Sequence, residues 1–212
     1  MKKFYVLRHG QTVANTEHRL QGQTDTHLNE VGISQAKLAG TFLAETKIVP
    51  DVIIVSPLTR VKETAEYATG KERSSFEVDP RIIEMGFGVL EMLRTDHMTP
   101  EFYEEFHHRT DIYHAPEGGE TFYELIARVG SFIETMRARE DHGETILVVS
   151  HGAAIHALIN YIDQEAITKF WDIHVGNCAI LEVHLGDRRE DGEDSWTFLH
   201  EGFHANATLK DK

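Results

Sequence analysis

The chain has 212 residues, of which 41% are hydrophobic and 26% are charged, which suits one soluble domain with a sizeable core. A single cysteine, Cys178, excludes an internal disulfide and a zinc site built from several cysteines. The formal net charge of −14 disfavours general binding to nucleic acids or anionic membranes, which requires basic patches. An anionic substrate would therefore need a local concentration of positive charge.

Nothing in the sequence predicts a membrane or secretory segment. No apolar run approaches the length that crosses a bilayer. The apolar residues 4–7 follow two lysines, but they are too few for a signal peptide. We therefore expect a cytoplasmic protein.

The first part of the chain alternates apolar runs and amphipathic stretches. Residues 3–8 predict a buried strand, and residues 30–45 place their apolar side chains at helical spacing. Residues 51–55 predict a second buried strand. Ser56 and Pro57 then supply a capping hydroxyl and a proline at the first helical position, which predicts a helix that runs to about Ala68.

The second part of the chain continues this alternation. Residues 121–140 carry an apolar stripe typical of a long amphipathic helix. Residues 145–149 predict a third buried strand, and a further helix is expected from Gly152 onward. Residues 178–185 and 196–199 read as late strands.

Continuous apolar strands separated by amphipathic helices predict an α/β fold with a mostly parallel central sheet and helices on both faces. Residues 86–120 are less regular and rich in glycine and proline, so we expect a small helical excursion that forms a cap or lid. We predict a single domain over residues 1–212 that includes this cap.

Each of the three predicted core strands is followed by a cationic or protonatable side chain. Arg8 and His9 follow the first, Arg60 lies near the start of the helix after the second, and His151 follows the third. Taken singly, each residue also has an ordinary structural explanation. Because ligands of open α/β sheets bind beyond the carboxyl ends of the strands, these side chains should meet at one edge. Together they predict a positive pocket for an anion.

These motifs resemble those of the histidine phosphatase superfamily, which includes cofactor-dependent phosphoglycerate mutases and many phosphomonoesterases. The resemblance extends from Phe4 to about Leu185, and it implies a phosphoglycerate mutase-like fold. It rests on Arg8-His9-Gly10, Ser56-Pro57-Leu58-x-Arg60 and Ser150-His151-Gly152. Supporting matches are Asn15, the stretch Arg19-Leu20-Gln21-Gly22-Gln23-Thr24-Asp25 with Leu28 and Gly32, Glu63-Thr64-Ala65, Glu84 with Phe87-Gly88, and Pro116-Glu117-Gly118-Gly119-Glu120-Thr121.

The residue types suit transfer of a phosphoryl group. A neutral imidazole is a competent nucleophile, so His9 could attack phosphorus while a backbone carbonyl of its loop holds the other ring nitrogen. Arg8 and Arg60 offer planar forks of donors to phosphate oxygens. His151, if protonated, would add charge in the transition state, and Gly152 could add backbone N–H groups. Because side chains supply the charge, we expect no metal and no cofactor.

The resemblance places the general acid at Glu84, which would protonate the leaving alcohol and later activate water. Glu91 is a nearby competitor for this role. The family often has a Glu-Gly pair here, whereas this chain has Glu91-Met92, which puts the local loop in question. The resemblance also implies phosphate or substrate contacts for three further residues, Asn15, Gln21 and Gly22. Turn and capping roles explain these three nearly as well. For Glu120 we expect a structural role, as a first-turn carboxylate of the long helix.

Mutases of the family carry a longer insertion than the stretch between Glu84 and His151 here. A shorter cap suggests a more open pocket, in which water completes turnover. We therefore predict a hydrolase: a metal-independent phosphomonoesterase of the histidine acid phosphatase type that forms a phosphohistidine. Mutase-type phosphotransfer is the alternative. Two other classes remain open, namely a non-catalytic anion-binding module and a metal-binding protein that uses His107, His108 and His114.

The expected partner is a small phosphorylated metabolite, and neither a nucleic acid nor a membrane is expected. A homodimer stays open. Specificity should depend on residues 86–120, where apolar side chains could form a wall that tolerates bulky or aromatic phosphomonoesters, or could simply pack the cap onto the sheet. These side chains are Met92, Leu93, Met98, Phe102, Tyr103, Phe106 and Tyr113.

Overall fold

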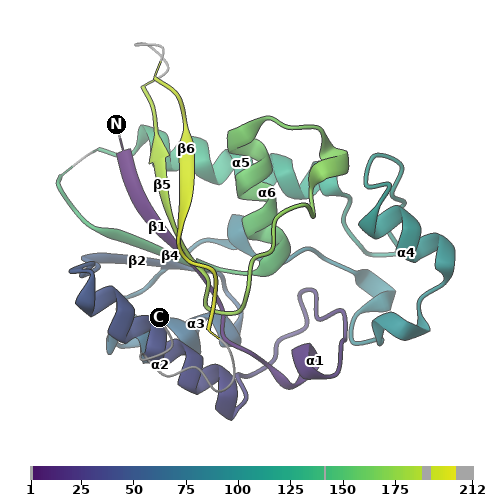
Figure 1. Ribbon diagram of the computed structural model, residues 1–212, viewed down its shortest axis with the longest axis horizontal. Coiled ribbons are helices and arrows are strands. Elements are labelled where there is room, and N and C mark those ends of the chain that lie inside the picture. The colour runs from purple at the N-terminus through teal and green to yellow at the C-terminus, as the bar shows by residue number, and fades with distance from the viewer. Residues whose placement is uncertain (1, 141, 188–191, 204–212) are drawn as a thin grey trace.

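The structure is a computed structural model that describes residues 2–140, 142–187 and 192–203. Within these residues, six strands form one sheet in the order β3-β2-β4-β1-β5-β6 (Figure 1). The strands are β1 (Lys2–Arg8), β2 (Val52–Val55), β3 (Glu77–Val78), β4 (Ile146–Ser150), β5 (Ile180–Leu185) and β6 (Ser195–His200). Neighbours from β3 to β1 are parallel, whereas β5 is antiparallel to β1 and β6 to β5. The predicted α/β fold with a mostly parallel sheet is confirmed.

The helices connect these strands. They are α1 (Val13–Thr16), α2 (Glu30–Glu45), α3 (Thr59–Thr69), α4 (Pro100–His107), α5 (Phe122–Ala138) and α6 (Gly152–Asp163). Short 3₁₀ turns are η1 (Arg73–Ser75), η2 (Pro80–Ile82), η3 (Gly88–Leu90), η4 (Thr95–His97) and η5 (Ile167–Lys169). Within the described ranges, no helix is both long enough and apolar enough to span a membrane.

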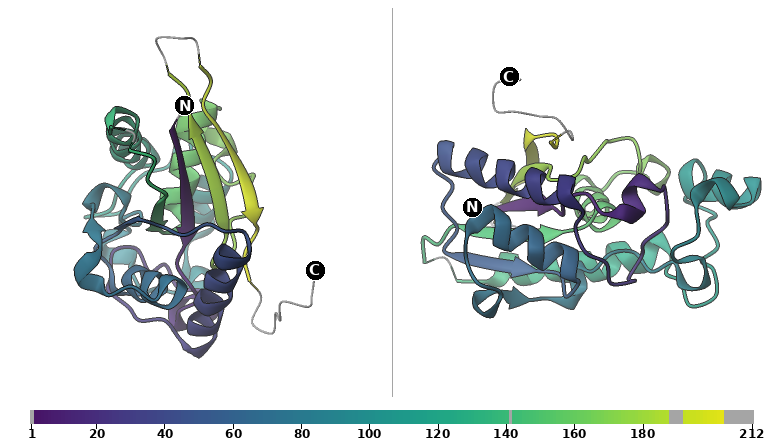
Figure 2. Two further views of the ribbon diagram at one scale, coloured as in Figure 1. Left: turned by 90° about the vertical axis from the view of Figure 1, so that its left-hand side faces the viewer. Right: turned by 90° about the horizontal axis from the view of Figure 1, so that it is seen from below.

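Helices cover both faces of the sheet, which explains why its strands read as continuous apolar runs. Along β1, Tyr5 and Leu7 pack with α2 and α3, whereas Phe4 and Val6 pack with α5 and α6. The residues of β2 and β4 alternate in the same way. Figure 2 shows helical ribbons on the two sides of the strands. The carboxyl edge of the parallel strands is therefore where a ligand can reach the sheet.

Local capping signals fix several helix starts. Asn29 precedes α2, and its side-chain oxygen accepts a hydrogen bond from the backbone N–H of Gly32 at 2.8 Å. Thr121 and Glu124 form a reciprocal capping box at the start of α5. The range predicted for α2 is confirmed, and α5 is slightly shorter than predicted.

The predicted start of α3 is wrong. The helix begins at Thr59 and has no side-chain cap from Ser56. The Ser56 hydroxyl lies 2.7 Å from the Nε2 atom of His151 instead. The carboxylate of Asp25, from a distant loop, accepts hydrogen bonds from the backbone N–H and the hydroxyl of Thr59, both at 2.7 Å. A tertiary contact thus replaces the local cap, and Ser56 becomes a partner of a site residue.

The cap segment (residues 86–120) contains η3, η4 and α4 and lies at one end of the molecule, as the teal ribbon in Figure 2 shows. Aromatic contacts attach it to the remainder of the fold. The Phe106 ring lies 5.5 Å from that of Phe122 on α5 and 5.1 Å from that of Trp171. The indole N–H of Trp171 also donates to the Phe106 carbonyl at 2.6 Å. The cap is therefore joined to the segment that precedes β5.

Helices α2 and α3 cross at a glycine. A Cβ atom on Gly40 would lie 2.3 Å from the carbonyl oxygen of Ala68, so only glycine permits this approach. In an ordinary helix interior, replacement of glycine by alanine stabilises by about 0.5–1 kcal/mol. At Gly40 the close backbone contact should make the same replacement destabilising.

We predict that Gly40→Ala lowers the free energy of unfolding by about 1–3 kcal/mol, because the added methyl group must push the two helices apart. Urea unfolding followed by circular dichroism measures the change. Thr41→Ala, an exposed position on the same helix, is the matched control and should be close to neutral. A gain in stability for Gly40→Ala would contradict the packing described.

Candidate active site

A cavity of about 400 Å³ lies at the carboxyl edge of the parallel strands. All the predicted site residues except His151 line it. These are Arg8, His9, Asn15, Gln21, Gly22, Arg60, Glu84 and Gly152. His151 is fully buried beside the cavity, and its ring centre lies 5.3 Å from that of His9. The structure thus brings together residues that the sequence separates by more than a hundred positions.

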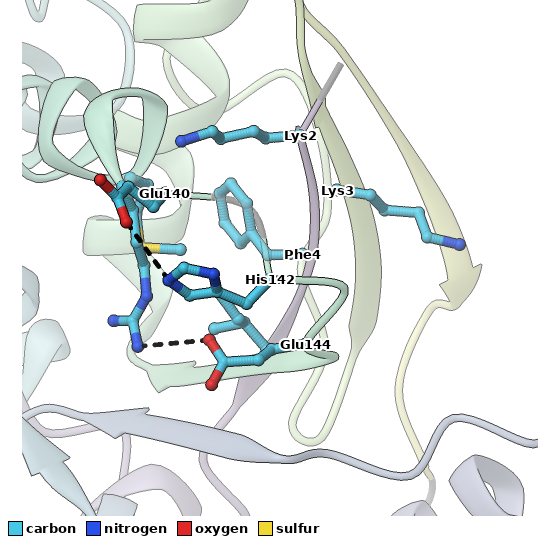
Figure 3. Close-up of a pocket in the computed structure, with 9 residues that line it drawn as sticks. Lys2, Lys3, Phe4, Glu140, His142 and Glu144 are labelled. Carbon is cyan, nitrogen blue, oxygen red and sulfur yellow. Dashed lines mark ion pairs between the residues drawn. The ribbon is translucent and has the colours of Figure 1, made fainter.

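A second hollow, of about 30 Å³, lies at the opposite end of β1 and β4 (Figure 3). Four of its charged side chains form two pairs: His142 lies 3.5 Å from Glu140, and Arg139 lies 3.8 Å from Glu144. This volume has room for a water molecule but not for a phosphomonoester. The cavity around His9 is the candidate active site because it gathers the predicted site residues.

His9 is held in one tautomer. Its Nδ1 atom lies 2.7 Å from the carbonyl oxygen of Gly10. Because a carbonyl can only accept, Nδ1 must carry the hydrogen, which leaves the lone pair on Nε2. Burial lowers the pKa of His9 well below its ordinary value, and the charges of Arg60 and Arg8 lower it further. The ring is therefore neutral and ready to act as a nucleophile.

Two guanidinium groups flank this ring, that of Arg60 buried and that of Arg8 half-buried. Arg60 is fully buried; its two terminal nitrogens donate to the carbonyls of Thr24 at 2.9 Å and Gly22 at 2.8 Å. A terminal nitrogen of Arg8 donates to the carbonyl of Val175. In both arginines, the buried Nε atom has no hydrogen-bond partner among the described residues. Buried donors on a cation are seldom left unpaired, so this pair is suited to an anion with several oxygens.

The surroundings of His151 favour its neutral ring. Burial lowers its pKa well below the ordinary value, and Arg60, His9 and Arg8 add to the effect. Its Nε2 atom shares a 2.7 Å hydrogen bond with Ser56, while its buried Nδ1 atom lacks a partner among the described residues. The positive charge considered for His151 therefore requires a bound anion, which would favour the protonated ring.

Among the described residues, Glu84 is one of two carboxylates that line the cavity, with Asp172 as the other. One oxygen of Glu84 accepts hydrogen bonds from the backbone N–H groups of Met85 at 3.0 Å and Ala154 at 3.1 Å. The other accepts from Ala153 at 3.4 Å, so the side chain lies against the positive N-terminus of α6. This contact brings a proton carrier to the wall that also holds His9.

Glu91 has a different task. Its oxygens accept from the backbone N–H of Gln23 at 2.8 Å and the hydroxyl of Thr24 at 2.5 Å, and it does not line the cavity. Met92 adopts the left-handed conformation, with φ of 63°, at the position where the family often has glycine. Its backbone N–H donates to the Leu20 carbonyl at 2.7 Å. Glu91 thus stabilises the loop at residues 23 and 24, and Glu84 is the remaining candidate for the general acid.

The comparisons with known proteins agree with this geometry. The sequence model of the histidine phosphatase superfamily (branch 1) matches residues 4–194. The chain belongs to this superfamily. Phosphoserine phosphatase 1 of Hydrogenobacter thermophilus is 32% identical over 89% of this chain and 89% of its own length. A probable phosphoglycerate mutase, GpmB, of Yersinia pestis is 34% identical over 86% of this chain and 85% of its own.

Among solved structures, the chain is similar to a mycobacterial glucosyl-3-phosphoglycerate phosphatase in complex with VO3. The TM-score is 0.77 at 27% identity, over 94% of this chain and 98% of that one. The superfamily and its phosphatase-named members together support a phosphatase of the histidine phosphatase type.

Asn15 and Gln21 combine a capping role with a place on the cavity wall. The side-chain oxygen of Asn15 accepts from the backbone N–H of Thr12 at 3.1 Å. That of Gln21 accepts from the hydroxyls of Thr12 at 2.9 Å and Thr26 at 2.8 Å. Because their oxygens serve the loop, both amides can offer N–H groups to an anion. Gly22, at φ of 54°, packs so closely on Glu91 that a Cβ would overlap it.

The predicted wall residue Phe106 lines the cavity, as do Arg19, Leu20 and Phe87 of the family-like motifs. Sequence reasoning missed the other wall residues, which are Ala153, His156 and residues 171–175. No sequence motif marks residues 171–175. They reach the cavity because β5 is antiparallel to β1, so the chain must return to the carboxyl edge before it enters β5. His107, His108 and His114, which were considered as metal ligands, form no metal site with one another or with the described acidic side chains. The described residues contain no cluster of three or more metal-ligating side chains.

Three buried histidines should make the fold sensitive to acid. Burial lowers the pKa of His9 and His151 well below the ordinary value and lowers that of His156, helped by Arg8, to about 3. Below about pH 6.5 the unfolded chain binds these protons and the folded chain does not. The stability is therefore fully present above that pH and is lost as the pH falls toward the folded pKa values.

We predict that His156→Gln flattens the fall of the free energy of unfolding between about pH 6.5 and pH 5, by about 1 kcal/mol per pH unit. Urea unfolding at a series of pH values, for the wild type and the variant, provides the test. Carboxylates contribute equally to both proteins, so the difference isolates His156. Parallel curves would show that His156 takes up its proton in the folded state.

Proposed function

We propose that the chain is a metal-independent phosphomonoesterase of the histidine acid phosphatase type, acting through a phosphohistidine at His9. The observation that supports this most directly is the single tautomer of His9, whose Nε2 atom lies in a cavity beside two guanidinium groups with buried Nε atoms. A module that only binds anions needs neither this orientation nor a carboxylic acid on the same wall.

In the first step, Nε2 of His9 attacks phosphorus, the bond from phosphorus to the ester oxygen breaks, and Glu84 gives a proton to the leaving alcohol. The ring gains positive character, so its hydrogen bond to the Gly10 carbonyl strengthens in the transition state. Arg8 and Arg60 neutralise the oxygens of the transferring group. In the second step, Glu84 takes a proton from water, which attacks phosphorus and releases phosphate and neutral His9.

The substrate we propose is a small phosphomonoester whose alcohol portion has an apolar face. Of the seven apolar cap residues predicted to form a wall, only Phe106 lines the cavity, where it is joined by Phe87 and Trp171. Phe102 and Tyr113 pack against Phe106 at 5.6 Å between ring centres, so they support the wall from behind. The cavity volume of about 400 Å³ suits a metabolite-sized ligand.

We predict that His9→Ala lowers the release of inorganic phosphate from p-nitrophenyl phosphate by about 1000-fold or more, as removal of a catalytic nucleophile does. The assay contains EDTA, because no metal is expected to take part. Wild-type enzyme quenched during turnover of labelled substrate should retain an acid-labile, alkali-stable label.

His184→Ala is the matched control, because His184 lies on β5 and does not line the cavity. It should retain wild-type activity. Equal release of phosphate by wild type and His9→Ala would remove His9 as the nucleophile. Loss of wild-type activity in EDTA would contradict the metal-independent mechanism.

The relative named as a mutase keeps phosphotransfer as the second candidate. We predict that p-nitrophenol does not exceed inorganic phosphate when p-nitrophenyl phosphate is the donor and 3-phosphoglycerate is added as acceptor, because water takes the phosphoryl group. Colorimetric assays of both products give the ratio. An excess of p-nitrophenol over phosphate, with a bisphosphorylated product, would favour the mutase.

A further inference from the structure

Arg128, on α5, makes an unusually complete set of hydrogen bonds for a residue outside the cavity. Its guanidinium forms a two-pronged ion pair with Glu120, at 2.6 and 2.8 Å. The same group donates to three backbone carbonyls: Arg81 at 2.8 Å, Ile83 at 2.7 Å and Glu84 at 3.0 Å. One side chain thus holds the backbone that carries the proposed general acid.

The backbone that leads to Glu84 lies outside the strands of the described sheet, so side chains satisfy its carbonyls. The hydroxyl of Ser150 donates to the Ile82 carbonyl at 2.8 Å, and the amide of Gln23 donates to the Glu84 carbonyl at 3.1 Å. With the bonds from Arg128, every carbonyl from residue 81 to residue 84 accepts from a side chain. Arg128 supplies three of these contacts, so it is the principal support.

Glu120 fixes Arg128 from the other side and also reaches the backbone just beyond Glu84. Its backbone N–H donates to the Gly86 carbonyl at 2.9 Å, and its carboxylate accepts from the Gly86 N–H at 3.4 Å. Both charged side chains are largely buried, at 20% and 15% exposure. The pair therefore clamps the chain immediately before and after the acid.

We propose that Arg128, oriented by Glu120, is a positioning residue for Glu84 in the reaction proposed above, on whose assignment of the acid this inference rests. The Glu84 carboxyl reaches the cavity only where its backbone lies close enough for it to meet the N-terminus of α6. A displacement of about 1 Å at a reacting group can reduce a rate by about 100-fold. The ion pair sets that position without contact with the substrate.

A purely structural ion pair would give a different result from a positioning pair. Loss of proton donation slows transfer to His9 most when the leaving group is a poor one. Phenolate needs a proton more than p-nitrophenolate does, although phenyl phosphate and p-nitrophenyl phosphate are similar in shape. The ratio of their kcat/KM values therefore measures proton donation and cancels losses in folded protein. The value of kcat/KM reports the first step and excludes hydrolysis of the phosphohistidine.

The experiment compares this ratio in wild type, Arg128→Met, Glu120→Gln and Glu84→Gln. Glu120→Gln keeps the side-chain volume, and it serves if Arg128→Met does not fold. The matched control is Arg137→Met, because Arg137 also lies on α5. Its ion pair, with Asp194 at 2.5 Å, does not involve the proposed acid. Circular dichroism and thermal unfolding establish that each variant is folded.

We expect Arg128→Met and Glu120→Gln to shift the ratio toward p-nitrophenyl phosphate by about 10-fold, Glu84→Gln by more, and Arg137→Met not at all. If the ratio shifts in Glu84→Gln but stays at the wild-type value in folded Arg128→Met and Glu120→Gln, the positioning role is overturned. Glu84 would then still be assigned as the acid. An unchanged ratio in Glu84→Gln would overturn the acid assignment and this inference together. A shift in Arg137→Met equal to that in Arg128→Met would show a general loss of packing and overturn the positioning role.

Discussion

The constraint on which the site depends is the placement of one buried and one half-buried guanidinium group in a strongly acidic chain. A buried cation must be paired or well solvated by dipoles, because transfer from water into the protein interior is costly. Backbone carbonyls of residues 22 and 24 solvate Arg60, and that of Val175 solvates Arg8. These dipoles leave a net positive charge beside Glu84, and a phosphate dianion is suited to balance it. The loops around the cavity are folded to supply these carbonyls.

The same field governs the protonation of the two site histidines. Burial is the larger cause of their low pKa values, but Arg60 and Arg8 contribute in the same direction. The arginines proposed to hold phosphate therefore also keep His9 neutral, as the proposed nucleophile requires. When a dianion enters, its charge opposes that of the arginines, and protonation of His151 becomes less unfavourable. Binding of a dianionic substrate and protonation of His151 would thus be electrostatically coupled.

The sequence was sufficient for the sheet core and for most of the predicted residues that line the cavity. Strands covered on both faces must be continuously apolar, and parallel strands must end at one edge, so β1, β2 and β4 placed Arg8, His9 and His151 together. It was insufficient where a distant residue replaces a local partner. Ser56 has the ordinary signature of a helix cap, yet it binds His151, 95 positions away. The antiparallel direction of β5, which brings residues 171–175 to the cavity, has no signature in residues 178–185.

The residues that the sequence predicted and those that it did not predict differ in the kind of contact they make. Groups that act on the substrate must be particular side chains, so they leave motifs in a sequence. Groups that hold those side chains in place act here mainly on backbone carbonyls, as Arg128 does on residues 81, 83 and 84. Every residue has a carbonyl, so the accepting side of such a contact leaves no trace in the sequence. The donor then reads as one more charged residue on an amphipathic helix, and only the fold reveals what it holds.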